Sequence, residues 1–199
     1  MKLFLSFIIA AVLFSISCNS NKDKITVRDA DGNKATIDLS DVKDMAKSME
    51  QNQSKAEALK KLTPLSLDQL KELIPEEFMG MKRSSFNTTN AMGFASCNAE
   101  YKSEDGKELK VELLDCAGEL GANMYAIRFF GLWNYEEEND NGYQKTIDLN
   151  GDKAIEKFQK NNNQYNLTYF SNERLLVNLE GQNMGIDELK LAAKSLNLK

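Results

Sequence analysis

Two cysteines in the middle of the chain are the side chains whose spacing most directly suggests a chemical bond. Cys97 and Cys116 lie in the stretches 94–102 and 108–116, which alternate apolar and polar residues and are separated by residues 104–107. This pattern predicts two antiparallel strands joined by a turn. Two thiols on paired strands form a disulfide if they face each other in an oxidising compartment. The pairing register therefore decides between a disulfide and two separate thiols.

The register that buries the better set of apolar side chains places Tyr101 opposite Val111. In this register Cys97 faces Asp115, and Cys116 points to the other side of the sheet. A bulge at the end of the second strand, or a four-residue turn, would bring the two thiols opposite each other instead. Such a bulge would also turn Asp115 toward solvent. Both outcomes stay open for the cysteines, and the better-buried register favours separate thiols.

A thiol nucleophile lacks an activating base in this sequence, because none of the 199 residues is histidine. This absence excludes Ser-His-Asp and Cys-His catalysis and histidine-based zinc sites. The glycines form neither a GxGxxG motif nor a P-loop, so we expect no cofactor. A net charge of −5 without a basic face argues against nucleic acid as a partner. Chemistry that needs only Asp and Glu is not excluded, but the spacing nominates no pair, so no catalytic residue is predicted.

Two acidic segments resemble calcium-binding loops, yet each has a simpler interpretation. Asp29, Asp31 and Asn33 suggest an EF-hand, but Lys34 stands where that loop needs glycine. We therefore expect a plain Asp-Gly turn there. The run Glu136–Asn141 offers carboxylate and amide oxygens to calcium, but charge runs are more often solvated loops. The sequence thus predicts no metal site.

Three neighbouring aromatic residues are the best candidates for a ligand-binding surface. Phe129, Phe130 and Trp133 lie at the end of the stretch 121–132, which has too few polar positions for a surface helix. We expect this helix to bury most of its surface. The aromatic side chains either line a ligand cleft or, as is more common at helical spacing, complete the core.

The chain begins with the pattern of an export signal. One positive charge is followed by an apolar stretch, residues 3–16, which is too short to span a bilayer. The small residues Ser15 and Ser17 then precede Cys18, which fits cleavage by a signal peptidase. The segment resembles the lipobox of bacterial lipoproteins. Ser15 replaces the usual leucine, a departure that Bacteroidetes lipoproteins tolerate.

The lipobox resemblance implies that residues 1–17 are a signal peptide and that Cys18 becomes the acylated N-terminus. Acyl chains on Cys18 would hold the protein on a membrane of the bacterial cell envelope, at a periplasmic or surface face. The alternatives are a plain secreted protein cut at the same bond and a buried core helix.

Residues 18–64 are predicted to form an N-terminal appendage of the anchored protein. A hairpin is expected over 25–39, with a three-residue connection that places Val27 opposite Ile37. A helix follows over 41–62, with an apolar stripe interrupted by a wholly polar middle. Such a helix is typical of a peripheral element or of a spacer between lipid and domain.

Residues 65–199 are predicted to form the main domain. It begins with a short helix whose capping box is Ser66 and Gln69 and which ends before Pro75. The elements expected after it are a strand near 79–86, the hairpin 94–102 and 108–116, a helix at 121–132, strands near 143–149, 153–158, 165–170 and 174–180, and a last helix at 186–196. This order predicts an α+β fold, an antiparallel sheet of about six to seven strands with packing helices.

Several short motifs carry a resemblance to known proteins. They are Pro64-Leu65, Leu73–Glu77, Gly80–Arg83, Ala99–Tyr101, Asn141–Tyr143 and the closing strand Leu175–Gly181. Through them residues 64–181 resemble a family of uncharacterised Bacteroidetes-type lipoproteins. The order of strands and helices also resembles the extrinsic oxygen-evolving-complex subunits of photosystem II. Neither resemblance supplies a catalytic residue.

The sequence as a whole predicts a membrane-anchored envelope lipoprotein with a non-enzymatic binding or assembly role. Its expected partners are membrane lipid, through acylated Cys18, and an unknown envelope protein or small ligand. The alternative is an Asp/Glu-dependent envelope hydrolase. A deep pocket that holds two convergent carboxylates of raised pKa would favour the hydrolase.

Overall fold

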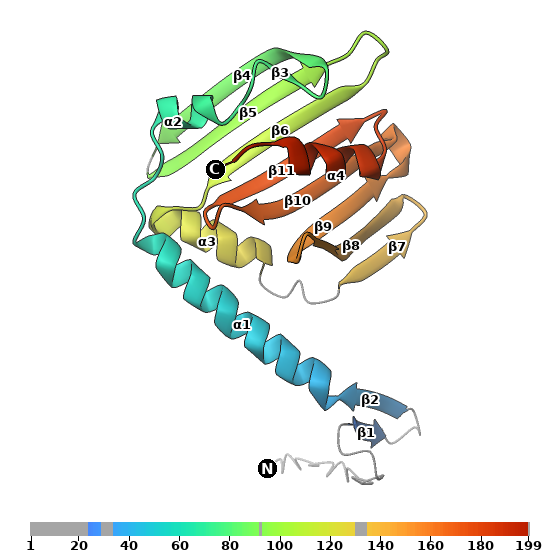
Figure 1. Cartoon of the computed structure of the whole chain (residues 1–199). Helices are drawn as coiled ribbons and strands as arrows, with labels where there is room; N and C mark the ends of the chain where they lie inside the picture. The colour runs from blue at the N-terminus through green and yellow to red at the C-terminus, as the bar shows by residue number, and fades with distance from the viewer. Residues whose placement is uncertain (1–23, 29–33, 92, 130–134, 199) are drawn as a thin grey trace, which may run out of the picture. The chain divides into compact units, whose positions relative to one another are not determined.

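The computed structural model describes residues 24–28, 34–91, 93–129 and 135–198 (Figure 1). Its contacts divide the chain into two compact units, Met1–Ser48 and Met49–Lys199. The division falls inside the long helix α1, Leu39–Lys60, so the C-terminal half of this helix belongs to the second unit.

The first unit contains the predicted hairpin, in a different register. Strands β1, Lys24–Arg28, and β2, Lys34–Asp38, pair antiparallel, and Ile25 lies opposite Ile37. The prediction that Val27 faces Ile37 is therefore wrong, because the connection between the strands is longer than three residues. A shift of two residues leaves every side chain on the same face of the hairpin, so apolar alternation cannot distinguish the two registers.

A nine-stranded antiparallel sheet makes up most of the second unit. The strand order is β3-β4-β5-β6-β11-β10-β9-β8-β7, so two meanders meet where β6 pairs with β11. The strands are β3 Glu77–Phe78, β4 Met81–Ala91, β5 Phe94–Lys102, β6 Glu108–Asp115, β7 Glu136–Asn139, β8 Gly142–Leu149, β9 Asp152–Gln159, β10 Gln164–Ser171 and β11 Leu175–Gln182, with a short 3₁₀ helix at Lys160–Asn162. The predicted α+β class with an antiparallel sheet is confirmed.

The sheet has more strands than predicted because its two edges carry strands without an apolar pattern. At one edge β3 has only two residues. At the other, β7 contains most of the acidic run that was predicted to be a solvated loop, and that prediction is wrong. All four residues of β7 are exposed. Glutamate and asparagine are depleted in strands, so nothing in the composition of this run indicates an edge strand.

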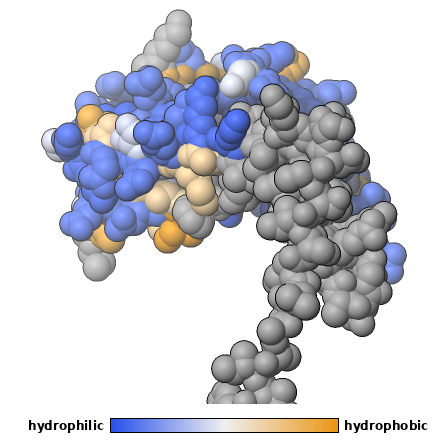
Figure 2. Space-filling model, turned by 90° about the horizontal axis from the view of Figure 1, so that it is seen from below, coloured by the Kyte–Doolittle hydropathy of each residue, from blue (hydrophilic) through white to orange (hydrophobic). Residues whose placement is uncertain are grey.

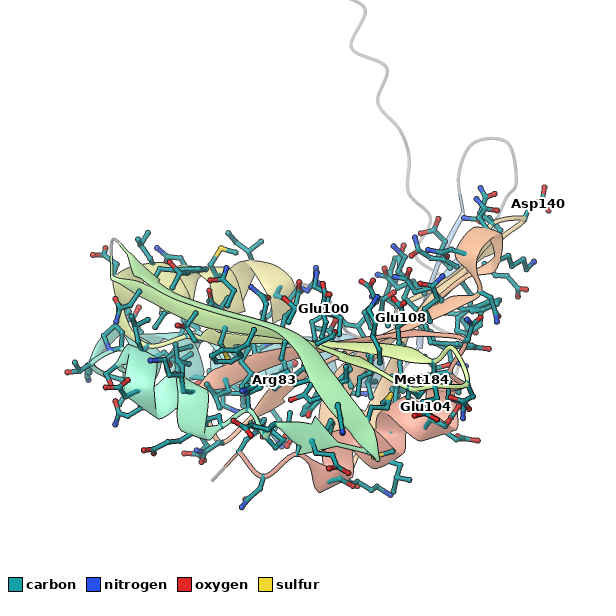
Figure 3. All side chains as sticks on the ribbon, turned by 90° about the horizontal axis from the view of Figure 1, so that it is seen from above. Arg83, Glu100, Glu104, Glu108, Asp140 and Met184 are labelled. Carbon is teal, nitrogen blue, oxygen red and sulfur yellow. The ribbon has the colours of Figure 1, made fainter. Side chains whose placement is uncertain are left out.

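Helices cover the two faces of the sheet unequally. The helices α2, Leu67–Glu72, and α4, Ile186–Ser195, lie on one face, and α3, Gly118–Phe129, lies on the opposite face (Figure 3). The first face carries the main core, which includes Leu70, Tyr101, Val111, Leu179 and Leu189. The opposite face has a smaller cluster, formed with α3 and the end of α1 by Ala56, Leu59, Cys116, Ala122, Tyr125 and Phe170. The described surface visible in Figure 2 is mainly hydrophilic, with small apolar patches.

The hairpin of β5 and β6 has a register two residues away from the predicted one. Tyr101 pairs with Leu109, not Val111, and Cys97 pairs with Leu113. The turn explains the difference, because the Ser103 hydroxyl accepts a hydrogen bond from the Lys107 amide at 3.0 Å and closes the turn early. By contrast, the predicted capping box of α2 is confirmed: the Ser66 hydroxyl and the Gln69 side chain cap each other's backbone amides at 3.3 and 2.9 Å.

Candidate functional site

Polar side chains form rows on the sheet face opposite the main core, in the part of this face that lies beside α3. Asn98 on β5 pairs with Glu112 on β6, Glu112 with Asn178 on β11, and Asn178 with Thr168 on β10. Directly paired residues point to the same face with Cβ atoms about 4.5–5.5 Å apart. These four side chains therefore make a continuous row across four strands.

A second row lies two residues further along the strands and extends toward the β7 edge. It consists of Lys110, Glu180, Asn166, Lys157 and Gln144, each paired with the next. The row contains two lysines, one glutamate and two amides. No apolar side chain interrupts it, so this part of the sheet face is built to contact water or a polar ligand.

Three adjoining hollows lie over the two rows. The hollow next to α3 has a volume of about 520 Å³, the middle one about 300 Å³ and the one near β7 about 520 Å³. Gln144 lines all three hollows, and Lys157 and Gln159 line the second and third. We call this continuous depression the polar trough, floored by Asn98, Glu112, Gln144, Lys157, Thr168 and Asn178.

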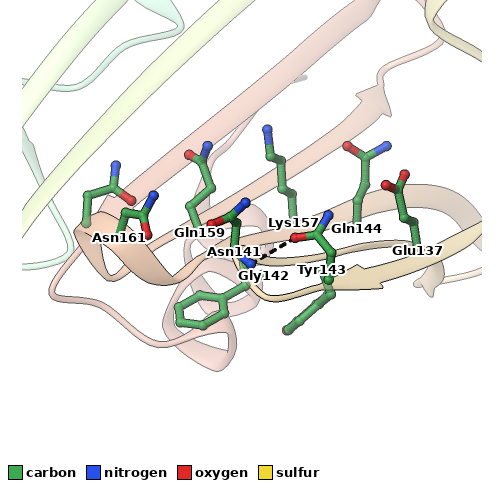
Figure 4. A pocket seen from close by; sticks show the side chains of 11 residues that line it. Glu137, Asn141, Gly142, Tyr143, Gln144, Lys157, Gln159 and Asn161 are labelled. Carbon is green, nitrogen blue, oxygen red and sulfur yellow. Dashed lines mark hydrogen bonds between the residues drawn. The ribbon is translucent and has the colours of Figure 1, made fainter.

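The end of the trough near β7 is lined by amides and charged groups (Figure 4). Gln159, Lys157, Gln144 and Glu137 project to the same side of the sheet, whereas the ring of Tyr143 points to the other side. The end of the sheet that carries Asp140 rises on the side where α3 lies (Figure 3). The trough is therefore bounded by α3 at one end and by the β7–β8 hairpin at the other.

A helix with an apolar outer surface forms the wall of the trough. Met124 and Ile127 of α3 line the first hollow together with Arg128. Met124 is 44% exposed and Ile127 is 74% exposed, and Leu120 lies one turn earlier at 47%. The prediction that this helix buries most of its surface is therefore wrong: α3 presents an apolar stripe outward, and only its other side is in the core.

Tight packing holds α3 in this place. A Cβ atom on Gly121 would lie 2.5 Å from the carbonyl carbon of Cys116, so only glycine permits this approach of helix to strand end. Tyr125 packs its ring against Phe170 with centroids 4.6 Å apart, and its hydroxyl donates to Asn52 of α1 at 3.0 Å. The wall of the trough is thus rigidly attached to the sheet.

Hydrogen bonds fix the central row. The Thr168 hydroxyl donates to Asn178 Oδ1 at 3.0 Å, and Asn178 Nδ2 donates to Glu112 Oε2 at 3.0 Å. Lys110 Nζ lies 2.8 Å from the other oxygen of Glu112. Burial raises the pKa of Glu112, but the hydrogen bonds from Lys110 and Asn178, with the positive charges of Lys110 and Arg128, outweigh burial and hold this pKa below its ordinary value. The row is preorganised, with Glu112 ionised near neutral pH.

Other amides in the trough keep their hydrogen-bonding capacity free. Among the residues that the structure describes, the side chains of Asn98, Gln144 and Gln159 have no hydrogen-bond partner, although each is partly buried. An amide supplies two donors and an acceptor with two lone pairs. Partly buried amides without protein partners are the groups from which a ligand can gain hydrogen bonds.

The two cysteines do not meet. The structure has both as free, fully buried thiols. Cys97 belongs to the main core, whereas Cys116 belongs to the smaller cluster on the opposite face. Burial raises the pKa of each thiol to about 12, so neither is a thiolate near neutral pH.

The other side chains singled out from the sequence are placed only in part. Phe129 ends α3, and its side chain is not among those described. Cys18, Phe130 and Trp133 lie outside the described residues, as do Asp29, Asp31 and Asn33. Within the ranges that the structure does describe, no three His, Cys, Asp or Glu side chains are grouped so as to hold a metal ion.

Asp115 is a structural anchor. It is completely buried, not turned to solvent as the predicted bulge would require. Arg174 donates to it from Nε at 3.0 Å and from Nη2 at 2.7 Å, and the amides of Leu65 and Ala117 donate at 2.7 and 3.2 Å. Arg174 also donates to the Thr63 carbonyl at 2.9 Å. This cluster fastens the segment before α2 to the junction of the two meanders.

Glu156 makes a second buried ionic cluster, on the face that α4 covers. It is 2% exposed, accepts from the Tyr143 hydroxyl at 2.7 Å, and lies 3.1 Å from Lys190 of α4 and 3.5 Å from Lys145. Burial raises the pKa of Glu156, but Tyr143 and the two lysines more than compensate, so its pKa is lowered. This cluster attaches α4 to the sheet and lies on the face opposite the trough.

The trough residues Asn98, Thr168 and Asn178 were not identified from the sequence. Each belongs to a strand in which polar residues occupy alternate positions. This pattern alone indicates only that one side of the strand faces solvent. Their alignment depends on the registers of three ladders. In the register predicted for β5 and β6, Asn98 would have faced Leu114 instead of Glu112, and the row would not have formed.

Comparison with protein-family models, with curated proteins and with solved structures found no match to this chain. In the described part of the chain, no helix is both long enough and apolar enough to cross a membrane.

Proposed function

We propose that this protein is a non-enzymatic lipoprotein of the bacterial cell envelope that binds a ligand in the polar trough. The observation that carries the proposal is the trough itself, a hollow of about 520 Å³ between an apolar helix surface and a polar floor. Among the described residues, this floor includes the unpartnered amides of Asn98 and Gln144. Ligand sites combine apolar walls with a few oriented polar groups in this way. Acylated Cys18 would hold the protein at a membrane, by the resemblance of Ser15–Cys18 to a lipobox.

The alternative, an Asp/Glu-dependent hydrolase, is less favoured by the chemistry of the trough. A hydrolase of glycosidic bonds needs a general acid whose pKa is raised so that it is protonated near neutral pH. Glu112, the carboxylate of the central row, has a lowered pKa because Lys110 and Asn178 stabilise its charged form. Glu112 is thus suited to accept hydrogen bonds from a ligand and not to donate a proton.

The finer fold that we propose is that of the extrinsic oxygen-evolving-complex subunits. An antiparallel sheet with helices on both faces supports this proposal. An experimental structure that superposes on those subunits with the same strand order would test it.

The binding proposal is tested by photo-crosslinking in cells. A photoreactive residue replaces Ile127, which is 74% exposed beside the trough, or Leu191, which is 54% exposed on α4 on the opposite face. We expect an adduct from position 127 and none from position 191. We also expect this adduct to weaken when Asn98 and Gln144 are both changed to alanine. Equal adducts from both positions, or none from position 127, would contradict binding in the trough.

A further inference from the structure

We infer that the polar trough binds a neutral oligosaccharide, an inference that rests on the proposed binding function. The first argument is the pairing of donors and acceptors on the floor. Asn98, Gln144 and Gln159 each present an amide that has no partner among the described residues, and Asn178 retains one N–H and one lone pair after bonding Thr168 and Glu112. Hydroxyl groups both donate and accept, so a polyhydroxylated ligand matches such a floor.

The balance of charge favours a neutral ligand. Glu112, Glu137 and Glu180 face the trough with Lys157 and Arg128, and Lys110 is paired with Glu112. An anionic ligand would approach the three carboxylates, and a cationic ligand would approach Arg128 and Lys157. Like charges brought together in a partly desolvated site reject a ligand. The trough therefore discriminates against ions of either sign.

The apolar wall matches the C–H faces of a sugar ring. Met124 and Ile127 of α3 line the first hollow opposite the floor, and Phe94 of β5 adds an apolar side chain from the sheet itself. A pyranose presents hydroxyl groups at its rim and C–H groups on its ring faces. A ring that lies between wall and floor would place its C–H groups against the apolar side chains and its hydroxyls against the amides.

The dimensions of the trough favour a chain over a single sugar. The floor runs across the strands from Asn98 on β5 to Glu137 on β7. These strands are separated by six inter-strand steps of about 4.8 Å, or roughly 29 Å. Several sugar units fit along this length.

An extended peptide fits this floor less well. Peptides that bind sheets usually add a strand to an edge, where free backbone groups pair with them. The trough lies over the middle of the sheet, where the backbone groups of β6, β11, β10 and β9 pair with both neighbours. Only side chains are available there, and they suit hydroxyl groups.

The test is binding of defined oligosaccharides to the full protein purified from membranes. The probes are hexamers of neutral hexoses, neutral pentoses and N-acetylhexosamines, with an anionic uronic acid hexamer, a cationic glucosamine hexamer and a pool of neutral decapeptides for comparison. We expect at least one neutral hexamer to bind and the charged hexamers to bind at least ten-fold more weakly, a margin of about 1.4 kcal/mol. Isothermal titration calorimetry measures the Kd of each.

Matched variants locate the binding. Asn98→Ala and Gln144→Ala each remove an amide that has no partner in the described protein, so the fold should be unaffected. We expect each to weaken binding about two- to ten-fold, the loss of one neutral hydrogen bond. The control Gln53→Ala removes an exposed amide on α1, outside the trough, and should leave Kd unchanged.

The outcomes separate this inference from the proposed function. No binding by any neutral hexamer overturns the inference, and so does preference for a charged hexamer or for the peptides. If position 127 still crosslinks a ligand in cells, the binding function stands and only the ligand class is wrong. If a neutral hexamer binds but neither trough variant weakens it, the inference about this site is overturned as well.

Discussion

The buried Asp115–Arg174 pair gives the sharpest prediction about stability. Asp115→Ala removes the acceptor of four hydrogen bonds from a site that is 0% exposed. Removing one partner of a buried ion pair costs about 3–5 kcal/mol, because the remaining charge is left without compensation. Arg174 is 21% exposed and regains some hydration, so we expect the lower end of this range. The second unit has a size for which about 1 kcal/mol corresponds to roughly 2–4 °C, so Tm should fall by roughly 6–12 °C.

Thermal and urea unfolding of the purified protein measure this effect. A double-mutant cycle with Arg174→Ala isolates the coupling between Asp115 and Arg174. The control Glu57→Ala breaks an exposed pair with Lys60 and should hardly change Tm. A loss below about 1 kcal/mol for Asp115→Ala, or additive effects of the two alanine variants, would refute the view that this pair fastens the two meanders together.

The other predictions concern the anchor, the thiols and the pH dependence. Cys18→Ala should release the protein from the membrane fraction, and an unchanged N-terminal mass in a variant that stays membrane-bound would contradict acylation. Cys97 and Cys116, with pKa values raised to about 12 by burial, should react with a thiol reagent at pH 8 only after urea is added; rapid labelling of the folded protein would contradict their burial. Because the folded state lowers the pKa of Glu156, its contribution to stability is present above the ordinary value of 4.5 and is lost as pH falls through the folded pKa. Glu156→Gln should therefore flatten the acid limb of the stability profile, as should Lys190→Met to a smaller degree, and identical acid limbs would exclude this role.

The sequence predicts correctly those features that are determined by residues close together in the chain. The capping box of Ser66 and Gln69 is correct because the groups that make it are three residues apart. The last helix, predicted at 186–196, and the α+β class are also correct, since apolar periodicity reports which face of an element is buried.

Features that depend on long-range pairing could not be predicted in this way. The partner of Asp115 is Arg174, which adjoins it only because β6 pairs with β11. The register of β5 and β6 was predicted wrongly because the Ser103 hydroxyl determines the turn between them. The alternation of apolar residues carries no information about this hydrogen bond. The trough needs three registers to be right at once, and the apolar stripe of α3 was mistaken for a core surface because composition does not show what lies opposite it.

The two meanders have a consequence for how the chain acquires its structure. Within the described sheet, every ladder except that of β6 and β11 joins strands that follow one another in the chain. Local hairpins close quickly because little loop entropy is lost. Each half of the sheet can therefore form on its own. We expect the docking of β11 against β6 to be the slow step, because it pairs strands that are distant in the chain. Asp115 and Arg174 lie at one end of this pair of strands. The central row of the trough, from Asn98 to Thr168, crosses the junction between β6 and β11. The trough therefore becomes complete only when these two strands pair.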